Sequence, residues 1–131
     1  MDIIPYRFNE QVLALYQAVG WTAYTEDKDK LERGFARSLL TLAAVEGDEL
    51  LGLVRVVGDG ETVVWIQDIL VKPPRQRQGI GKSLLRAVLD RYQGVRQVML
   101  MTDDSPATLA FYRSMGFAPM AELGCVGLIK K

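Results

Sequence analysis

The sequence predicts an α/β fold with a central mixed, mostly antiparallel sheet, on three observations. Two tight turns, Gly47-Asp48 and Asp59-Gly60, separate three runs of residues rich in Val, Leu and Ile. Connections this short require antiparallel hairpins. A long helical pattern leads from the third run to a fourth, and such a crossover makes the two strands that it joins parallel. With 131 residues and no linker or repeat, we expect one domain, residues 1–131.

The N-terminal part is expected to hold a short strand at residues 3–5 and two helices. Asn9 is a good N-cap, and apolar side chains at helical spacing follow it as far as Val19. The second helix is expected from near Asp27 to Ser38, because apolar side chains fall on one stripe there.

The middle of the chain is expected to form three strands, at residues 40–46, 49–57 and 62–71, which the two tight turns connect. An amphipathic helix follows at residues 79–92, where apolar positions recur at a spacing of about 3.6 residues. This helix crosses to a further strand at residues 95–101.

The C-terminal part is expected to hold a helix at residues 106–114 and two last strands, near Phe117 and at residues 125–129. Ser105 is a good N-cap, and the proline that follows it suits the first helical position. Cys125 is expected to be a small core residue in the last strand.

A basic, glycine-bearing loop joins the third hairpin strand to the long helix. Backbone N–H groups in the first turn of a helix have no partner within it, and the helix dipole adds partial positive charge there. Gly79 and Gly81 have no Cβ, so a phosphate group can approach the backbone closely. Arg75, Arg77 and Lys82 add formal charge. The sequence therefore predicts a phosphate site here, and it matches neither of the two common phosphate-loop patterns.

Within this loop, residues 76–81 read Gln-Arg-Gln-Gly-Ile-Gly. They resemble the signature of the GNAT superfamily of acyl-CoA N-acyltransferases: Gln or Arg, two residues, Gly, one residue, then Gly or Ala. Residues 105–117 are similar to that family's C-terminal motif, a helix that holds Phe-Tyr and ends in Gly-Phe. The resemblance implies a single GNAT domain with helices on both faces of the sheet. It also implies a splayed parallel strand pair that holds acetyl-CoA, the acyl donor.

The resemblance places the cofactor at the end of the 62–71 strand and in the loop. Backbone groups of residues 69–71 would pair with the pantetheine arm, and an N–H near Leu70 would polarise the thioester carbonyl. The alternative for this stretch is a plain buried strand. Many family members have Asn at the position of Ser105, and helix capping alone would explain the serine. The expected cofactor-binding residues are Ile69, Leu70, Val71, Gln76, Arg77, Gln78, Gly79, Ile80, Gly81, Lys82, Ser83, Ser105 and Tyr112.

Tyr112 is the main catalytic candidate. Aminolysis of a thioester expels a thiolate, which a positioned phenol can protonate as general acid. In members of the family that carry the Phe-Tyr pair, the tyrosine commonly has this role. The alternative is a helix tyrosine that packs its ring in the core and leaves its hydroxyl in water.

Asp68 is the second catalytic candidate and also a candidate for substrate binding. A carboxylate in the acceptor pocket could hold the substrate ammonium and accept its proton, and many GNAT enzymes for small amines have an acidic residue at this position. The alternative is a structural ion pair with Arg55 on the neighbouring strand, because a charge among apolar strand residues is costly unless paired. The family also implies a bulge in this strand, so alternation does not assign Asp68 to a face.

Trp21 and Tyr24 lie between the first two helices, a region that overhangs the acceptor site in this family. They could line the pocket or hold an ammonium by cation–π contact. The alternative is that both cover the core beneath a loop. Glu26, Asp27 and Asp29 could attract a cationic substrate, or could simply be a solvated helix start.

Composition narrows the function classes. Sixteen basic and sixteen acidic residues balance, so we expect neither a nucleic-acid nor a membrane partner. The absence of histidine, with a single cysteine, excludes His-based triads and Cys/His zinc sites, and we expect no metal. The lone cysteine, the lack of a signal segment and the lack of a long apolar run favour the cytoplasm.

The predicted function is transfer of an acetyl group from acetyl-CoA to a primary amine of a small molecule, by direct attack in a ternary complex. Two alternatives stay open: acetylation of a protein N-terminus or lysine, and a non-catalytic acyl-CoA-binding module. Assembly into a homodimer stays open as well.

Overall fold

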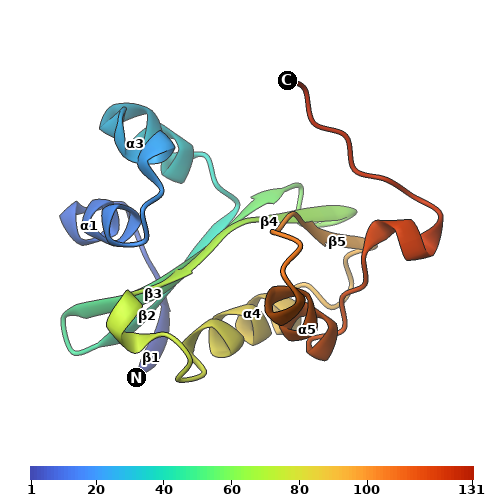
Figure 1. Ribbon diagram of the computed structural model, residues 1–131. Coiled ribbons are helices and arrows are strands. Elements are labelled where there is room, and N and C mark those ends of the chain that lie inside the picture. The colour runs from blue at the N-terminus through green and yellow to red at the C-terminus, as the bar shows by residue number, and fades with distance from the viewer. The chain divides into compact units, whose positions relative to one another are not determined.

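The computed structural model describes residues 1–131, which divide into two compact units, residues 1–101 and residues 102–131. The first unit holds a five-stranded sheet in the order β1-β2-β3-β4-β5 (Figure 1). Neighbouring strands are antiparallel from β1 to β4, and β4 pairs with β5 in parallel, which confirms the predicted α/β fold class. The strands are β1 Asp2–Pro5, β2 Leu40–Glu46, β3 Glu49–Gly58, β4 Val63–Val71 and β5 Gln97–Leu100. The expectation of a single domain stays a prediction.

The helices of the first unit begin where the sequence has capping side chains. The side chain of Asn9 accepts a hydrogen bond from the N–H of Val12, and that of Asp27 accepts one from the N–H of Lys30. A short helix between these two was not predicted. The α-helices of this unit are α1 Glu10–Ala18, α2 Thr22–Thr25, α3 Lys28–Ala36 and α4 Ile80–Arg91, and Pro73–Arg75 form a 3₁₀ turn, η1. None of the helices in the chain is both long enough and apolar enough to span a bilayer.

Helices cover both faces of the sheet, with α1 and α3 on one side and α4 on the other (Figure 1). The core on the first side is built from α1, α3 and the strands β2 to β4. On the other side α4 approaches β3 closely at Gly52, where a Cβ would lie 3.3 Å from the side chain of Ile80. The core on the first side contains Val12, Leu15, Tyr16, Leu31, Phe35, Ala43, Val45, Leu50, Leu53 and Leu70.

Strand β4 contains the expected bulge. Arg55 of β3 pairs with Asp68, whereas the next residue of β3, Val56, pairs with Ile66, so Gln67 is the extra residue on β4. The bulge shifts the alternation of side chains. Asp68 bonds to α1 through Tyr16, while Ile66 lies on the face that α4 covers, since its partner Val56 shares a face with Gly52.

The second unit contains α5, Pro106–Ser114, which Ser105 caps by accepting a hydrogen bond from the N–H of Thr108. The prediction of two last strands, near Phe117 and at residues 125–129, is wrong, because neither segment forms a strand. A second 3₁₀ turn, η2 Met120–Leu123, follows Pro119, and the chain after it makes no ladder.

The backbone hydrogen bonds of η2 and the residues next to it are formed locally. Pro119 has no N–H to give to a ladder, and its carbonyl accepts from the N–H of Glu122 instead. The N–H of Cys125 likewise bonds back to the carbonyl of Met120. Cys125 is exposed, so its predicted place in the core is also wrong.

Candidate functional site

The loop between β4 and α4 leaves the start of the helix open. Gly79 has a φ of +84° and Arg77 a φ of +63°, so two residues of this loop take the left-handed region. Gly79 is the N-cap of α4 and offers no side chain to the first turn. The N–H of Ser83 bonds to the carbonyl of Gly79 at 3.0 Å, and the N–H groups before it stay free to bind an anion.

The end of β4 lies beside this loop and is unpaired on one side. The ladder between β4 and β5 ends at Ile66 and Leu100, but β4 continues to Val71, so residues 67–71 have no strand on the β5 side. The side-chain amide of Gln76 donates to the carbonyl of Val71 at 3.1 Å and holds the loop to the strand end. The structure thus brings together the expected cofactor residues 69–71 and 76–83.

These residues fit the phosphates and the extended arm of an acyl-CoA. A Cβ at Gly79 would meet nothing within 4 Å, and one at Gly81 would meet only the side chain of Val71 at 3.8 Å, so the backbone of the loop is open to approach. Arg77 and Lys82 form no ion pair, and their charges stay available to an anion. The free N–H and C=O groups of residues 67–71 can hydrogen-bond an amide-containing arm as an added strand would.

Asp68 lies in a closed hydrogen-bond network. One carboxylate oxygen, Oδ2, accepts from Nε of Arg55 and from the hydroxyl of Tyr16, both at 2.8 Å. The other, Oδ1, accepts from the hydroxyl of Tyr24 at 2.8 Å. Asp68 is 2% exposed. The ion pair with Arg55 that the sequence left open is therefore present, and the role of Asp68 toward an amine stays a prediction.

Burial sets the protonation of this network. Loss of solvent, with the charge of Asp68 second, raises the pKa of Tyr16 above its ordinary value of 10.0. Burial also raises the pKa of Tyr24, although a hydrogen bond with Gln67 opposes the shift. Burial alone would lower the pKa of Arg55, but the charge of Asp68 and the bond to it raise that pKa overall. Both phenols are thus neutral donors at neutral pH, and the guanidinium is charged.

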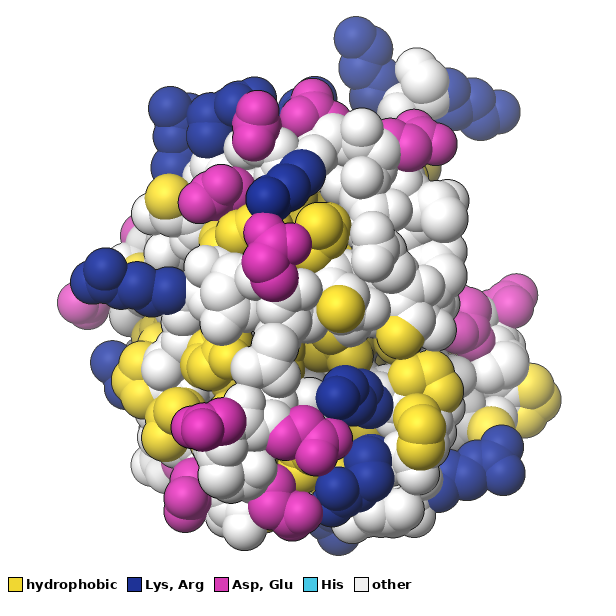
Figure 2. Space-filling view, turned by 90° about the vertical axis from the view of Figure 1, so that its left-hand side faces the viewer, with side chains coloured by type: hydrophobic (Ala, Val, Ile, Leu, Met, Phe, Trp, Pro, Cys, Tyr) yellow, Lys and Arg dark blue, Asp and Glu magenta, His cyan; other side chains and the backbone are white.

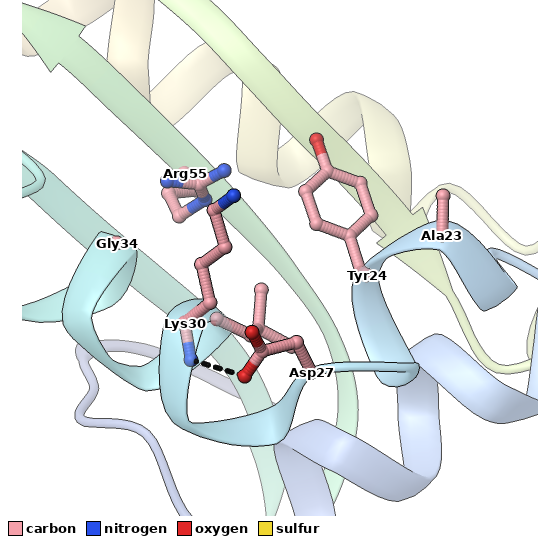
Figure 3. Close-up of a pocket in the computed structure, with 7 residues that line it drawn as sticks. Ala23, Tyr24, Asp27, Lys30, Gly34 and Arg55 are labelled. Carbon is pink, nitrogen blue, oxygen red and sulfur yellow. Dashed lines mark hydrogen bonds between the residues drawn. The ribbon is translucent and has the colours of Figure 1, made fainter.

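A cavity of about 310 Å³ opens next to this network, between α2, α3 and β3 (Figure 3). Tyr24 is among the residues that line it, and its role on the acceptor side stays a prediction. Trp21 does not line it; this residue is 37% exposed, and its ring packs against Tyr16 with centroids 6.0 Å apart. The residues that line the cavity are Ala23, Tyr24, Asp27, Lys30, Leu31, Gly34 and Arg55.

Sequence reasoning missed the cationic side of this cavity. Arg55 was considered only as a partner of Asp68, although a lone charge in an apolar strand could also have marked a pocket wall. Lys30 and Gly34 gave no signal, because a lysine on the first turns of a polar helix is usually solvated. Of the three acidic residues proposed to attract a cation, Asp27 lines the cavity, and Glu26 and Asp29 do not.

Tyr112 lies in the second unit, on α5, with its ring edge-on to Phe111 and Phe117 at centroid distances of 5.1 and 5.9 Å. Within this unit its hydroxyl makes no hydrogen bond. Burial, with the charge of Asp103 second, raises its pKa above the ordinary 10.0. The hydroxyl of Ser105 makes both of its hydrogen bonds within the first turn of α5. It accepts from the N–H of Thr108 and donates to the hydroxyl of the same residue at 2.8 Å. Ser105 thus caps the helix, and its contact with the cofactor stays a prediction.

The chain belongs to the acetyltransferase (GNAT) family, whose family model matches residues 7–117. A GNAT-family acetyltransferase from Streptococcus pneumoniae has the same fold, with a TM-score of 0.88 and 40% identity over 99% of this chain and 96% of that one. The ycf52-like N-acetyltransferase of Prochlorococcus marinus is 30% identical over 79% of this chain and 58% of its own length. The N-alpha-acetyltransferase RimI of Mycobacterium tuberculosis is 35% identical over 58% of this chain and 50% of its own. The matched part of the chain thus spans only 58% and 50% of the length of these two relatives.

Proposed function

We propose that the chain transfers an acetyl group from acetyl-CoA to a primary amine of a small molecule, by direct attack in a ternary complex. The observation that carries this proposal is the unpaired end of β4 beside the open start of α4. Together they offer a ladder edge for an amide-containing arm and free N–H groups for phosphates. Acetyl-CoA would supply the acyl group as a thioester.

The residues of the chain have separate tasks in this reaction. The N–H near Leu70 polarises the thioester carbonyl and stabilises the charge that develops on its oxygen. The amine nitrogen forms a bond to the carbonyl carbon, the carbon–sulfur bond breaks, and the amine gives up its proton to water or a base. Tyr112 donates its phenolic proton to the departing sulfur. With a pKa raised above the ordinary 10.0, the phenol is protonated at neutral pH, which is the state that a general acid requires.

The acceptor side favours a small molecule. The cavity at Tyr24 is of the size of small-molecule pockets, which begin at about 300 Å³. An extended acidic groove would instead favour a basic peptide. On the side where α1 and α3 lie, acidic, basic and apolar side chains are interspersed, and no acidic band crosses that face (Figure 2).

A protein N-terminus is the second candidate acceptor, and one observation favours it: the similarity to the N-alpha-acetyltransferase RimI. The third candidate, a non-catalytic acyl-CoA-binding module, would keep the cofactor site and lack turnover.

A thiol-release assay separates these candidates. The protein is incubated with acetyl-CoA and a panel of amines, amino acids, polyamines, amino sugars and short peptides, and free thiol is measured. We expect release with small amines that greatly exceeds release with peptides. Faster release with peptides would favour the N-terminal acetyltransferase. Binding of acetyl-CoA without release across the whole panel would favour the binding module.

A further inference from the structure

Arg55 presents an unused hydrogen-bonding edge to the cavity. Its Nε donates to Asp68 at 2.8 Å and its Nη1 to the hydroxyl of Ser38 at 3.2 Å, whereas Nη2 has no acceptor in the protein. The side chain is only 9% exposed. Every fully buried side-chain nitrogen and oxygen atom in the structure has a hydrogen-bond partner. Because Nη2 has none, it must be accessible to solvent, and the cavity is the opening that Arg55 lines.

The guanidinium is held in a fixed position. It lies over the ring of Phe35, with 5.3 Å from Cζ to the ring centroid, and next to the ring of Tyr24 at 6.0 Å. Asp68 and Ser38 fix the other two nitrogens. A planar group with five donors, immobilised in this way, is suited to bind the oxygens of a carboxylate.

A second cationic side chain, that of Lys30, lines the same cavity. Lys30 extends from α3 with its ammonium toward Arg55 (Figure 3), and it forms no ion pair in the structure. Two carboxylates are near, and neither is directed to this point. Asp27 lies at the opposite end of the Lys30 side chain, where it caps the helix, and Asp68 already accepts three hydrogen bonds. Two cationic groups thus face the cavity without an anion between them.

We propose that the acceptor carries a carboxylate as well as its amine, and that Lys30 and Nη2 of Arg55 bind this carboxylate in the cavity. The inference rests on the proposed function and specifies its substrate class as amino carboxylic acids. Asp68 is then a positioning residue, which orients Arg55 and Tyr24. The group that the cavity binds through Arg55 is then an anion, and the carboxylate of Asp68 keeps its three partners within the protein.

Matched pairs of acceptors test the proposal. Each pair differs only by the carboxylate: alanine and ethylamine, γ-aminobutyrate and propylamine, lysine and cadaverine. We expect the carboxylate-bearing member of at least one pair to have the higher kcat/KM. In Lys30→Gln that kcat/KM should fall about tenfold, the loss of one charge-assisted hydrogen bond, and the value for the simple amine should not change. Arg55 is left intact in this test, because its loss would leave Asp68 buried without a partner.

Lys28→Gln is the control, since Lys28 lies on the same helix, pairs with Glu10 and does not line the cavity. It should change neither kcat/KM. A preference for the simple amine in every pair, or an equal loss for both members in Lys30→Gln, would overturn the inference and leave the proposed function intact.

A binding measurement covers the case in which no amine is acetylated and the proposed function fails. The Nε–H resonance of Arg55 is followed by NMR in ¹⁵N-labelled protein as γ-aminobutyrate or propylamine is added. A shift with γ-aminobutyrate alone, weakened in Lys30→Gln, would support a carboxylate site that is independent of acetyl transfer. No shift with γ-aminobutyrate would refute it.

Discussion

Arg55 and Asp68 lie opposite one another on neighbouring strands, and the ion pair between them, 2.8 Å from Nε to Oδ2, is almost completely removed from water. Two tyrosine hydroxyls complete the coordination of the carboxylate. The pair lies directly behind the cavity, and the same guanidinium is both the partner of Asp68 and part of the cavity wall. One side chain therefore belongs both to the buried ion pair and to the wall of the cavity.

Asp68→Asn should destabilise the protein strongly. The substitution keeps the volume and an acceptor oxygen but leaves the charge of Arg55 buried without a partner, for which we expect a loss of about 3 kcal/mol in the free energy of unfolding. Urea titration measures it. Glu10→Gln, which removes the exposed pair with Lys28, should have a much smaller effect, because water screens that pair. A stable Asp68→Asn protein with normal acetyl-CoA binding and no amine turnover would instead assign Asp68 to catalysis.

Gly79→Val should abolish acetyl-CoA binding in a folded protein. Gly79 has a φ of +84°, which valine adopts only with strain of roughly 1–2 kcal/mol, and relief of that strain would move the first turn of α4. Calorimetric titration with acetyl-CoA measures the effect. Gly20→Val is a matched control, because its φ of +80° and open surroundings impose similar strain away from the loop. Unchanged affinity in Gly79→Val would remove the loop from the cofactor site.

Tyr112→Phe should lower the rate of acetyl transfer by about 10²–10⁴-fold, the usual contribution of a general acid. The ring packing with Phe111 and Phe117 is kept, so stability and acetyl-CoA affinity should change little. Because the pKa of Tyr112 is raised, the alkaline limb of the wild-type rate profile should lie above pH 10.0, and the variant should lack it. The control is Tyr92→Phe at the end of α4. Wild-type turnover in the Tyr112 variant would assign this ring to packing.

The protein should lose stability above pH 10.0. Well below that value the phenols of Tyr16 and Tyr24 are protonated in both the folded and the unfolded chain. Above it the unfolded chain releases protons that Tyr16 and Tyr24 retain in the fold, so the free energy of unfolding falls as pH rises. Thermal unfolding followed across this range measures the slope. Tyr16→Phe should have a shallower slope, and an equal slope in both proteins would exclude Tyr16 as its source.

Gly34→Ala should raise stability while it weakens acceptor binding. An alanine inside α3 stabilises the helix by about 0.5–1 kcal/mol. Its Cβ would contact Nη1 of Arg55 at 3.6 Å and take up part of the cavity that Gly34 lines. We expect KM for the acceptor to rise and the affinity for acetyl-CoA to stay constant. Ala36→Gly, the reverse change away from the cavity, should lower stability without altering KM, and a shared KM effect would indicate that the helix as a whole is responsible.

Local chemistry made much of this structure predictable from the sequence. The caps at Asn9, Asp27 and Ser105 form as their side chains require, and the two short turns set the antiparallel hairpins. The Arg55–Asp68 pair was foreseen as one of two alternatives, because a buried charge needs a partner.

The remainder depends on tertiary context that a single sequence does not contain. A strand forms only where a second strand accepts its ladder, and the apolar residues after Cys125 have none. Helix α2 has only four residues and no capping side chain, so no local signal marks it. Lys30 becomes part of a cavity wall only because α3 packs next to the strand that carries Arg55.

The bulge at Gln67 has a consequence for how substitutions in β4 combine. Ile66 and Asp68 are two positions apart, but they belong to opposite faces of the sheet, and changes at the two positions should be energetically additive. Asp68 and Tyr16 are 52 positions apart and share a hydrogen bond, so changes there should show a coupling energy of about 0.5–3 kcal/mol. Separation in sequence is therefore a poor guide to energetic coupling in this protein. A double-mutant cycle between β4 and α1 is needed to measure that coupling.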